Sequence, residues 1–86
     1  MTNEERIKKY EELLNNEGTR YIFLLQLNPQ QGFKTIEEYK TSLETFKFIQ
    51  DNYSKIKLNK KDKKEVLKFI KKGITLMYRG IHDLER

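Results

Sequence analysis

The sequence predicts a small all-α protein, an antiparallel bundle of four helical segments. Apolar residues recur at spacings of three and four through most of the chain, two Thr-x-x-Glu pairs mark helix starts, and short polar turns separate the periodic stretches. With 86 residues and no cysteine, the chain is expected to form one domain, 1–86, that folds by packing without disulfides or sulfur-bound metals.

The first helix is expected at about residues 3–17. Thr2 and Glu5 form a capping box at its start, and Gly18 is a favourable left-handed stop at its end. Its apolar face repeats at helical spacing through Ile7, Tyr10 and Leu14.

The second segment, about residues 19–28, precedes the turn sequence Asn-Pro-Gln-Gln-Gly at 28–32. Residues 21–27 are apolar on every side, so we expect them to be buried in either conformation. A strand is one alternative, but the only other strand-like piece, residues 55–58, is too short to satisfy a ladder. A short buried helix is therefore favoured.

The third helix is expected at about residues 36–53, with Thr35 and Glu38 as a second capping box. Its apolar face consists of Ile36, Tyr39, Leu43, Phe46, Ile49 and Tyr53. Phe48 falls outside this face. Either it packs on a second neighbour inside the bundle, or it is an exposed aromatic anchor for a partner.

The last helix is expected at about residues 60–85, starting after either Asn59 or Asp62. Gly73 and Gly80 lie on one shoulder of its apolar face, where each costs about 1 kcal/mol relative to alanine. They indicate either the close approach of a neighbouring helix or a kink or break at Gly73. The apolar face itself consists of Leu67, Ile70, Ile74, Met77, Ile81 and Leu84.

No reactive group in the sequence has the neighbours that catalysis needs. The single histidine, His82, is adjacent to Asp83, and adjacent helix residues point about 100° apart, so the two cannot form an oriented dyad. The paired glutamates fall in first turns or among lysines, and no glycine-rich turn leads into a helix to hold phosphate. We expect no enzymatic activity, no cofactor and no metal.

The strongest chemical feature is a basic face on the last helix. Residues 55–72 contain nine lysines against Asp62 and Glu65, which accounts for the whole positive excess of a chain with net charge +5. A helical projection places the following residues opposite the apolar face: Lys61, Lys64, Lys68, Lys72, Arg79 and Arg86. This face is either a solvated surface, a polyanion-binding surface or a docking surface for an acidic protein. Because it is nearly all lysine, it would hold phosphates without reading bases.

The start of the chain is acidic and polar, where a signal peptide would be basic and then apolar. The longest apolar run is far shorter than the roughly 20 residues of a membrane span. We therefore expect a cytoplasmic protein.

Part of the sequence resembles the last-helix region of immunity proteins for pediocin-like (class IIa) bacteriocins. The resemblance covers about residues 43–82 and extends to size, lysine content and absence of cysteine, whereas residues 19–33 depart from the family pattern. The residues that carry it are Lys55-Ile56-Lys57-Leu58-Asn59, Val66-Leu67, Gly73, Thr75 and Gly80-Ile81.

The resemblance implies a cytosolic antiparallel four-helix bundle. Members of the family protect the producing cell by recognising the bacteriocin-engaged sugar-transport receptor in the membrane. Carried over to this sequence, the candidate receptor contacts are Lys71, Lys72, Tyr78, Arg79 and His82.

The expected function is stoichiometric binding through the basic last helix, in its most specific form immunity at the inner face of a membrane receptor. The alternative is a phage or mobile-element accessory protein that binds nucleic acid, or inhibits a nucleic-acid enzyme, through the same lysines. The expected partner is a protein or membrane-receptor complex, or else an anionic surface such as nucleic acid or the inner leaflet. The chain is either a monomer or a homodimer. The predicted contact residues are Lys61, Lys64, Lys68, Lys71, Lys72, Tyr78, Arg79, His82 and Phe48.

Overall fold

The computed structural model describes residues 2–27 and 33–85, and over these residues the protein is helical without any strand. The helices are α1 (Asn3–Asn15), α2 (Glu17–Leu27), α3 (Ile36–Asp51) and α4 (Lys60–Glu85), with a 3-10 turn, η1 (Tyr53–Lys55), between α3 and α4. The predicted all-α class with four helical segments is confirmed, and the second segment is a helix. The predicted turn at 28–32 and Arg86 lie outside the described residues.

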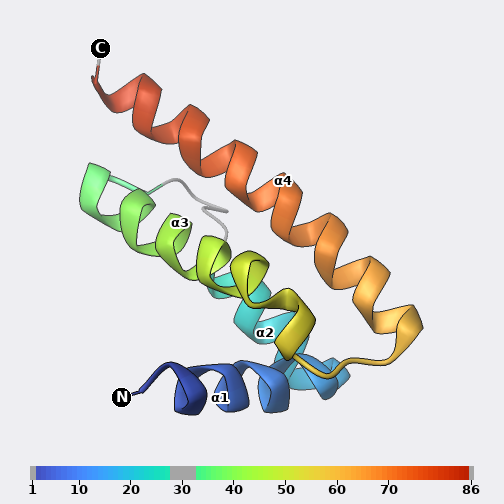
Figure 1. Cartoon of the computed structure of the whole chain (residues 1–86). Helices are drawn as coiled ribbons and strands as arrows, with labels where there is room; N and C mark the ends of the chain where they lie inside the picture. The colour runs from blue at the N-terminus through green and yellow to red at the C-terminus, as the bar shows by residue number, and fades with distance from the viewer. Residues whose placement is uncertain (1, 28–32, 86) are drawn as a thin grey trace.

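The framework of the molecule is the antiparallel pair α3 and α4 (Figure 1). α2 lies behind α3 in this view, and α1 lies across the end of the pair where α3 connects to α4. The Asn15 side-chain amide at the end of α1 donates to the Lys57 carbonyl at 2.7 Å, which joins α1 to this connection. No helix among the described residues has an apolar stretch long enough to cross a membrane.

The prediction that Gly18 ends the first helix is wrong, because α1 ends at Asn15 and Gly18 lies in the first turn of α2. The residue that separates the helices is Asn16, whose backbone is extended. Its side-chain oxygen accepts from the amides of Gly18 at 3.0 Å and Thr19 at 3.2 Å. An asparagine that caps the next helix in this way replaces the expected glycine stop.

The prediction that residues 21–27 are buried on every side is also wrong. Leu24 is buried, but Tyr21 and Ile22 are 66% and 58% exposed. α2 is a peripheral helix of eleven residues that packs along one side only, so its opposite side keeps apolar residues in contact with solvent.

The core lies between α3 and α4, with contributions from α1, α2 and the connection. The fully buried line of α4 is shifted from the predicted apolar face, since Leu67 and Ile74 are half-buried and Leu84 is 43% exposed. The glycine shoulder instead faces α3, as the buried α4 residues show: Val66, Ile70, Gly73 and Met77.

α4 runs without a break through Gly73 and has no sharp bend there (Figure 1), so the alternative of a kink or break at Gly73 is wrong and close approach of a neighbour explains the glycine. An ideal Cβ at Gly73 would lie 2.6 Å from Cζ of Phe46, and one at Gly80 would overlap the ring of Tyr39. What approaches each glycine is therefore an aromatic ring of α3.

α3 ends at Asp51, two residues before the predicted end at Tyr53. Asn52 closes it, because both its backbone amide and its side-chain amide donate to the Phe48 carbonyl, at 3.1 and 2.8 Å. Tyr53 then begins η1 and donates its hydroxyl to the Lys63 carbonyl of α4, and Ile56 is fully buried. The connection is thus fixed to the core.

Candidate binding face on the last helix

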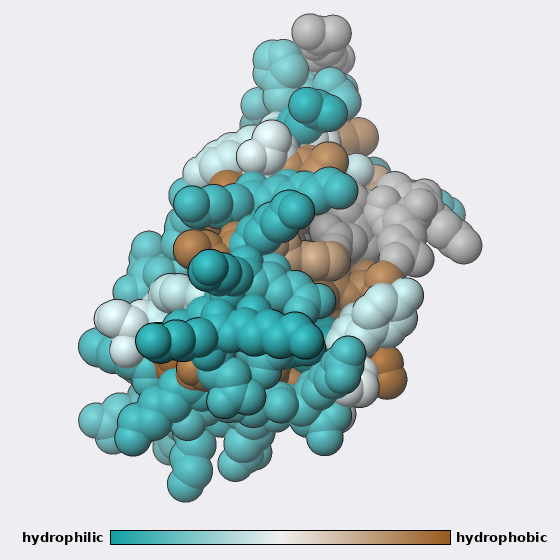
Figure 2. Space-filling view, turned by 90° about the vertical axis from the view of Figure 1, so that its right-hand side faces the viewer, coloured by the Kyte–Doolittle hydropathy of each residue, from teal (hydrophilic) through white to brown (hydrophobic). Residues whose placement is uncertain are grey.

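The structure brings eight of the nine predicted contact residues together on the outer side of α4. Each of them is exposed, and the side of the molecule that α4 forms is covered mostly by hydrophilic side chains (Figure 2). We call this set the α4 basic face: Lys61, Lys64, Lys68, Lys71, Lys72, Tyr78, Arg79 and His82.

The α4 basic face follows from the helical period. Buried residues recur along one side of α4, and the lysines occupy the positions half a turn away from them. At 1.5 Å per residue, Lys61 and Arg79 are separated by about 27 Å along the helix axis. The face is therefore an extended cationic strip.

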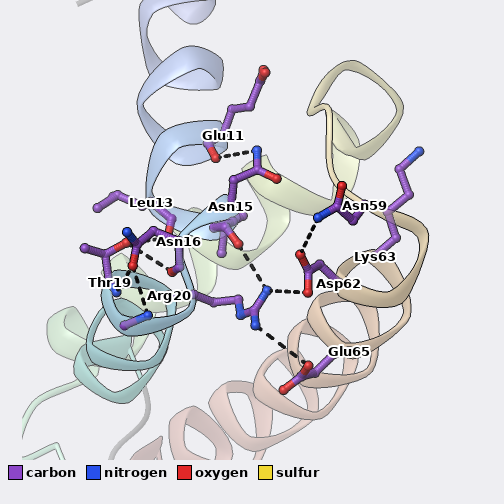
Figure 3. Close-up of polar contacts among 12 residues, drawn as sticks. Glu11, Leu13, Asn15, Asn16, Thr19, Arg20, Asn59, Asp62, Lys63 and Glu65 are labelled. Atoms are coloured by element: carbon purple, nitrogen blue, oxygen red, sulfur yellow. Dashed lines mark hydrogen bonds and ion pairs between the residues drawn. The ribbon is translucent and has the colours of Figure 1, made fainter.

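Both acidic residues of the lysine-rich stretch form ion pairs with Arg20 of α2 (Figure 3), but only Asp62 is largely buried, since the side chain of Glu65 is 65% exposed. The Arg20 guanidinium lies 3.0 Å from Asp62 and 3.9 Å from Glu65, and it donates to the Leu14 carbonyl at 3.3 Å. Asn59 adds a hydrogen bond to Asp62 at 3.2 Å. The charge of Asp62 is therefore offset inside the contact between α2 and α4, whereas Glu65 remains in contact with solvent at the edge of α4 that is nearest to Arg20.

The predictions from the sequence missed the role of Arg20. Its side chain is only 7% exposed, and it lies in a short helix directly before the apolar run 21–27. One available signal was position: Arg20 precedes Leu24 by one helical turn, on the side of α2 that Leu24 buries.

Phe48, the ninth predicted contact residue, lies on α3 and is half-buried against α1. The Arg6 guanidinium carbon lies 3.9 Å from the centre of its ring, and the Tyr10 ring meets it edge-on with centroids 5.7 Å apart. This position corresponds to the alternative in which Phe48 packs on a second neighbour inside the bundle. Phe48 is separate from the α4 basic face.

One further cation adjoins the α4 basic face from α3. The ammonium group of Lys47 lies 5.1 Å from the ring centre of Tyr78, which is itself 48% exposed. A cation at this distance from an aromatic face is favourable. Lys47 extends the positive surface across the junction of α3 and α4, a position that the helical projection of α4 alone could not reveal.

The chemistry of the α4 basic face is that of oxyanion binding. Ammonium and guanidinium groups donate hydrogen bonds and accept none, so they pair with carboxylates or phosphates. No group of three or more acidic, histidine or cysteine residues that could hold a metal ion occurs within residues 2–27 and 33–85. Comparisons of the chain with protein-family models, curated proteins and solved structures returned no significant match.

Proposed function

We propose that this protein acts by stoichiometric binding, without enzymatic activity, and docks on an anionic partner through the α4 basic face. The observation that carries the proposal is the separation of charge across α4. The lysines are exposed on one side, whereas Asp62 is largely buried against Arg20 and Glu65 lies 3.9 Å from the same guanidinium. Such a surface attracts an anionic partner over a distance set by screening, about 8 Å at physiological ionic strength.

The specific form of this proposal is immunity to a pediocin-like bacteriocin at the inner face of a membrane receptor. It is supported by the resemblance of residues 43–82 to that family and by the exposure of the carried-over residues Lys71, Lys72, Tyr78, Arg79 and His82. Aromatic and cationic side chains together on one rigid helix also suit a protein partner.

The test is to express the protein in a strain sensitive to pediocin-like peptides and to challenge the strain with a panel of them. Wild type and a triple control variant, Lys8→Glu, Lys9→Glu and Lys40→Glu, should protect the strain. The triple variant Lys64→Glu, Lys68→Glu and Lys72→Glu should not, although all six positions are exposed and the charge change is the same. Absence of protection by wild type against the whole panel would exclude immunity. Protection by both triple variants would show that the α4 basic face is not the binding surface.

A second candidate is nucleic-acid binding through the same face, favoured by the row of exposed lysines on one unbroken helix. Binding of this kind should weaken steeply with salt, by roughly 0.9 counterions per phosphate contact on duplex DNA. A titration of duplex and single-stranded probes at several salt concentrations measures the slope. A flat, weak signal at about 0.15 M salt on both probes would remove this candidate.

A further inference from the structure

The outward side of α2 is an apolar surface with no partner within the described molecule. Tyr21 and Ile22 are 66% and 58% exposed, and Leu25 is half-buried beside them. Residues 21–27 contain no charged side chain in a chain of which 36% of residues are charged. We call Tyr21, Ile22 and Leu25 the α2 ridge.

A groove borders the α2 ridge on each side. The larger one, about 400 Å³, runs between α1 and α2 and is lined mainly by apolar side chains, among them Tyr10, Leu13, Ile22 and Phe23. The smaller one, about 110 Å³, lies between α2 and α4, where Tyr21 and Leu25 meet Phe69. A ridge beside a groove is the shape that one helix presents to another.

The charges around the ridge nearly cancel. Arg20 lines the smaller groove beside Glu17 and Glu65, Lys9 lines the larger groove, and residues 1–20, a range that includes α1 and the start of α2, carry four basic and five acidic side chains. A strongly anionic occupant such as a lipid headgroup, nucleic acid or an acidic protein would find no excess of positive charge here, whereas the α4 basic face offers one. The occupant of the α2 ridge should therefore be apolar and close to neutral on the side that it presents.

We propose that this occupant is a second copy of the chain, with the α2 ridge of each protomer seated in the larger groove of the other. A two-fold interface needs a surface that complements itself, and a ridge next to a groove meets this condition. Charge supports the same arrangement, because the positive excess lies on residues 55–72, in the first half of α4 and the connection before it, whereas the α1 and α2 side is nearly neutral. Two copies can thus meet through α2 while both α4 basic faces point outward.

Gly18 fits this arrangement. Gly73 and Gly80 each face an aromatic ring of α3, but a Cβ on Gly18 would meet only the Asn16 side chain, at 3.4 Å. Gly18 lies one turn before Ile22 on the same helix, so its missing side chain leaves room beside the ridge for a helix that approaches from outside.

The dimer should be weak. α2 has eleven residues and is therefore about 16 Å long, so the contact falls at or below the roughly 800 Å² per partner of a stable complex. We expect a concentration-dependent equilibrium in the micromolar range or above.

Sedimentation velocity of the full chain over a wide concentration range tests the proposal. Wild type should shift from monomer towards dimer, and Ile22→Lys should raise the dissociation constant by at least about tenfold. Gln50→Lys is the matched control, since it adds the same charge at an exposed position of α3 and should leave the equilibrium unchanged. Circular dichroism checks that both variants are folded. A wild type that stays monomeric at millimolar concentration, or equal dissociation constants for the two variants, would overturn the proposal.

The absence of cysteine allows a second measurement of the same interface. Ile22→Cys should form a disulfide-linked dimer under mild oxidation faster than Lys64→Cys, which places the thiol on the α4 basic face. Equal rates would mean that the two α2 ridges do not meet. Neither readout depends on the partner of α4, so the dimer and the proposed binding function can fail separately.

Discussion

At the residue level, the contact between glycines of α4 and aromatic rings of α3 determines how closely the two helices pack. Phe46 is fully buried and fills the space in front of Gly73. A methyl group at Gly73 would stabilise the helix by up to about 1 kcal/mol through helix propensity. It would also overpack the contact with the buried Phe46 ring, which costs about 1–3 kcal/mol. We therefore predict that Gly73→Ala lowers the free energy of unfolding, measured by denaturant titration.

Gly18→Ala is the control for this prediction, because its Cβ would meet only the Asn16 side chain at an ordinary contact distance. It should leave the free energy of unfolding unchanged or raise it by up to about 1 kcal/mol. If Gly73→Ala were as stable as Gly18→Ala, Phe46 would not be held against α4 in the way described.

Arg20 is the other residue whose surroundings support a quantitative expectation. Replacing it by methionine keeps much of its volume but leaves Asp62, 17% exposed, without its cation. We predict that Arg20→Met destabilises the protein by about 3 kcal/mol, because breaking a largely buried pair strands the remaining charge. Adding Asp62→Asn to Arg20→Met should recover a good part of the loss, which a double-mutant cycle measures.

Glu44→Gln provides the comparison for an exposed pair. Glu44 lies 3.8 Å from Arg6 and its side chain is 72% exposed, so its replacement should change stability by less than about 1 kcal/mol. Equal losses from Arg20→Met and Glu44→Gln would show that burial does not strengthen the Arg20 pair.

At the level of elements, the sequence predicted the helices better than the points where they meet. Thr2 and Thr35 cap their helices as predicted, since each threonine oxygen accepts from the amide three residues later and its hydroxyl donates to the glutamate at that position. Local patterns of this kind depend only on neighbouring residues, so they can be recognised in a sequence. Whether Gly18 or Asn16 separates α1 from α2 depends on a competition between two plausible signals, which tertiary packing decides.

The connection from α3 to α4 has a pH dependence of its own. Burial raises the pKa of Tyr53 above its ordinary value of 10.0, and its hydroxyl donates to the Lys63 carbonyl. The folded state therefore holds the phenol proton more tightly than the unfolded state does. This contribution to stability is complete below about pH 10 and is lost as the pH rises through the folded pKa.

We predict that Tyr53→Phe makes the fall of unfolding free energy above about pH 10 shallower than in wild type, because phenylalanine does not titrate. The substitution also removes a hydrogen bond, so stability at neutral pH should drop by about 0.5–1.5 kcal/mol. Denaturant titrations at a series of alkaline pH values measure both effects. Tyr21→Phe, at a side chain that is 66% exposed, is the control, and identical slopes for the two variants would contradict the prediction.

For the whole molecule, the sequence predicted the basic face correctly and the apolar surface incorrectly. The position of the lysines on α4 follows from helical geometry alone, because a charged face opposite an apolar one turns outward. Residues 21–27 carry no such contrast, so periodicity cannot say which side of α2 the bundle covers. That answer depends on the length and position of α1 and α3, and it leaves Tyr21 and Ile22 exposed.

The α4 basic face also affects stability through the charges that it concentrates. Lys68 lies four residues from both Lys64 and Lys72, and like charges at this spacing cost about 0.2–0.5 kcal/mol per pair. Lys68→Gln should therefore raise the free energy of unfolding by up to about 1 kcal/mol at low salt, and the gain should shrink as added salt screens the repulsion.

Lys40→Gln is the control, because Lys40 lies near Glu37 and Glu44 on α3 and should lose a small attraction instead. Thermal and denaturant unfolding of both variants at low and high salt measures the difference. If the two substitutions change the free energy of unfolding equally, the lysines of α4 do not repel one another measurably. If only Lys68→Gln stabilises the protein, the α4 basic face lowers the stability of the fold.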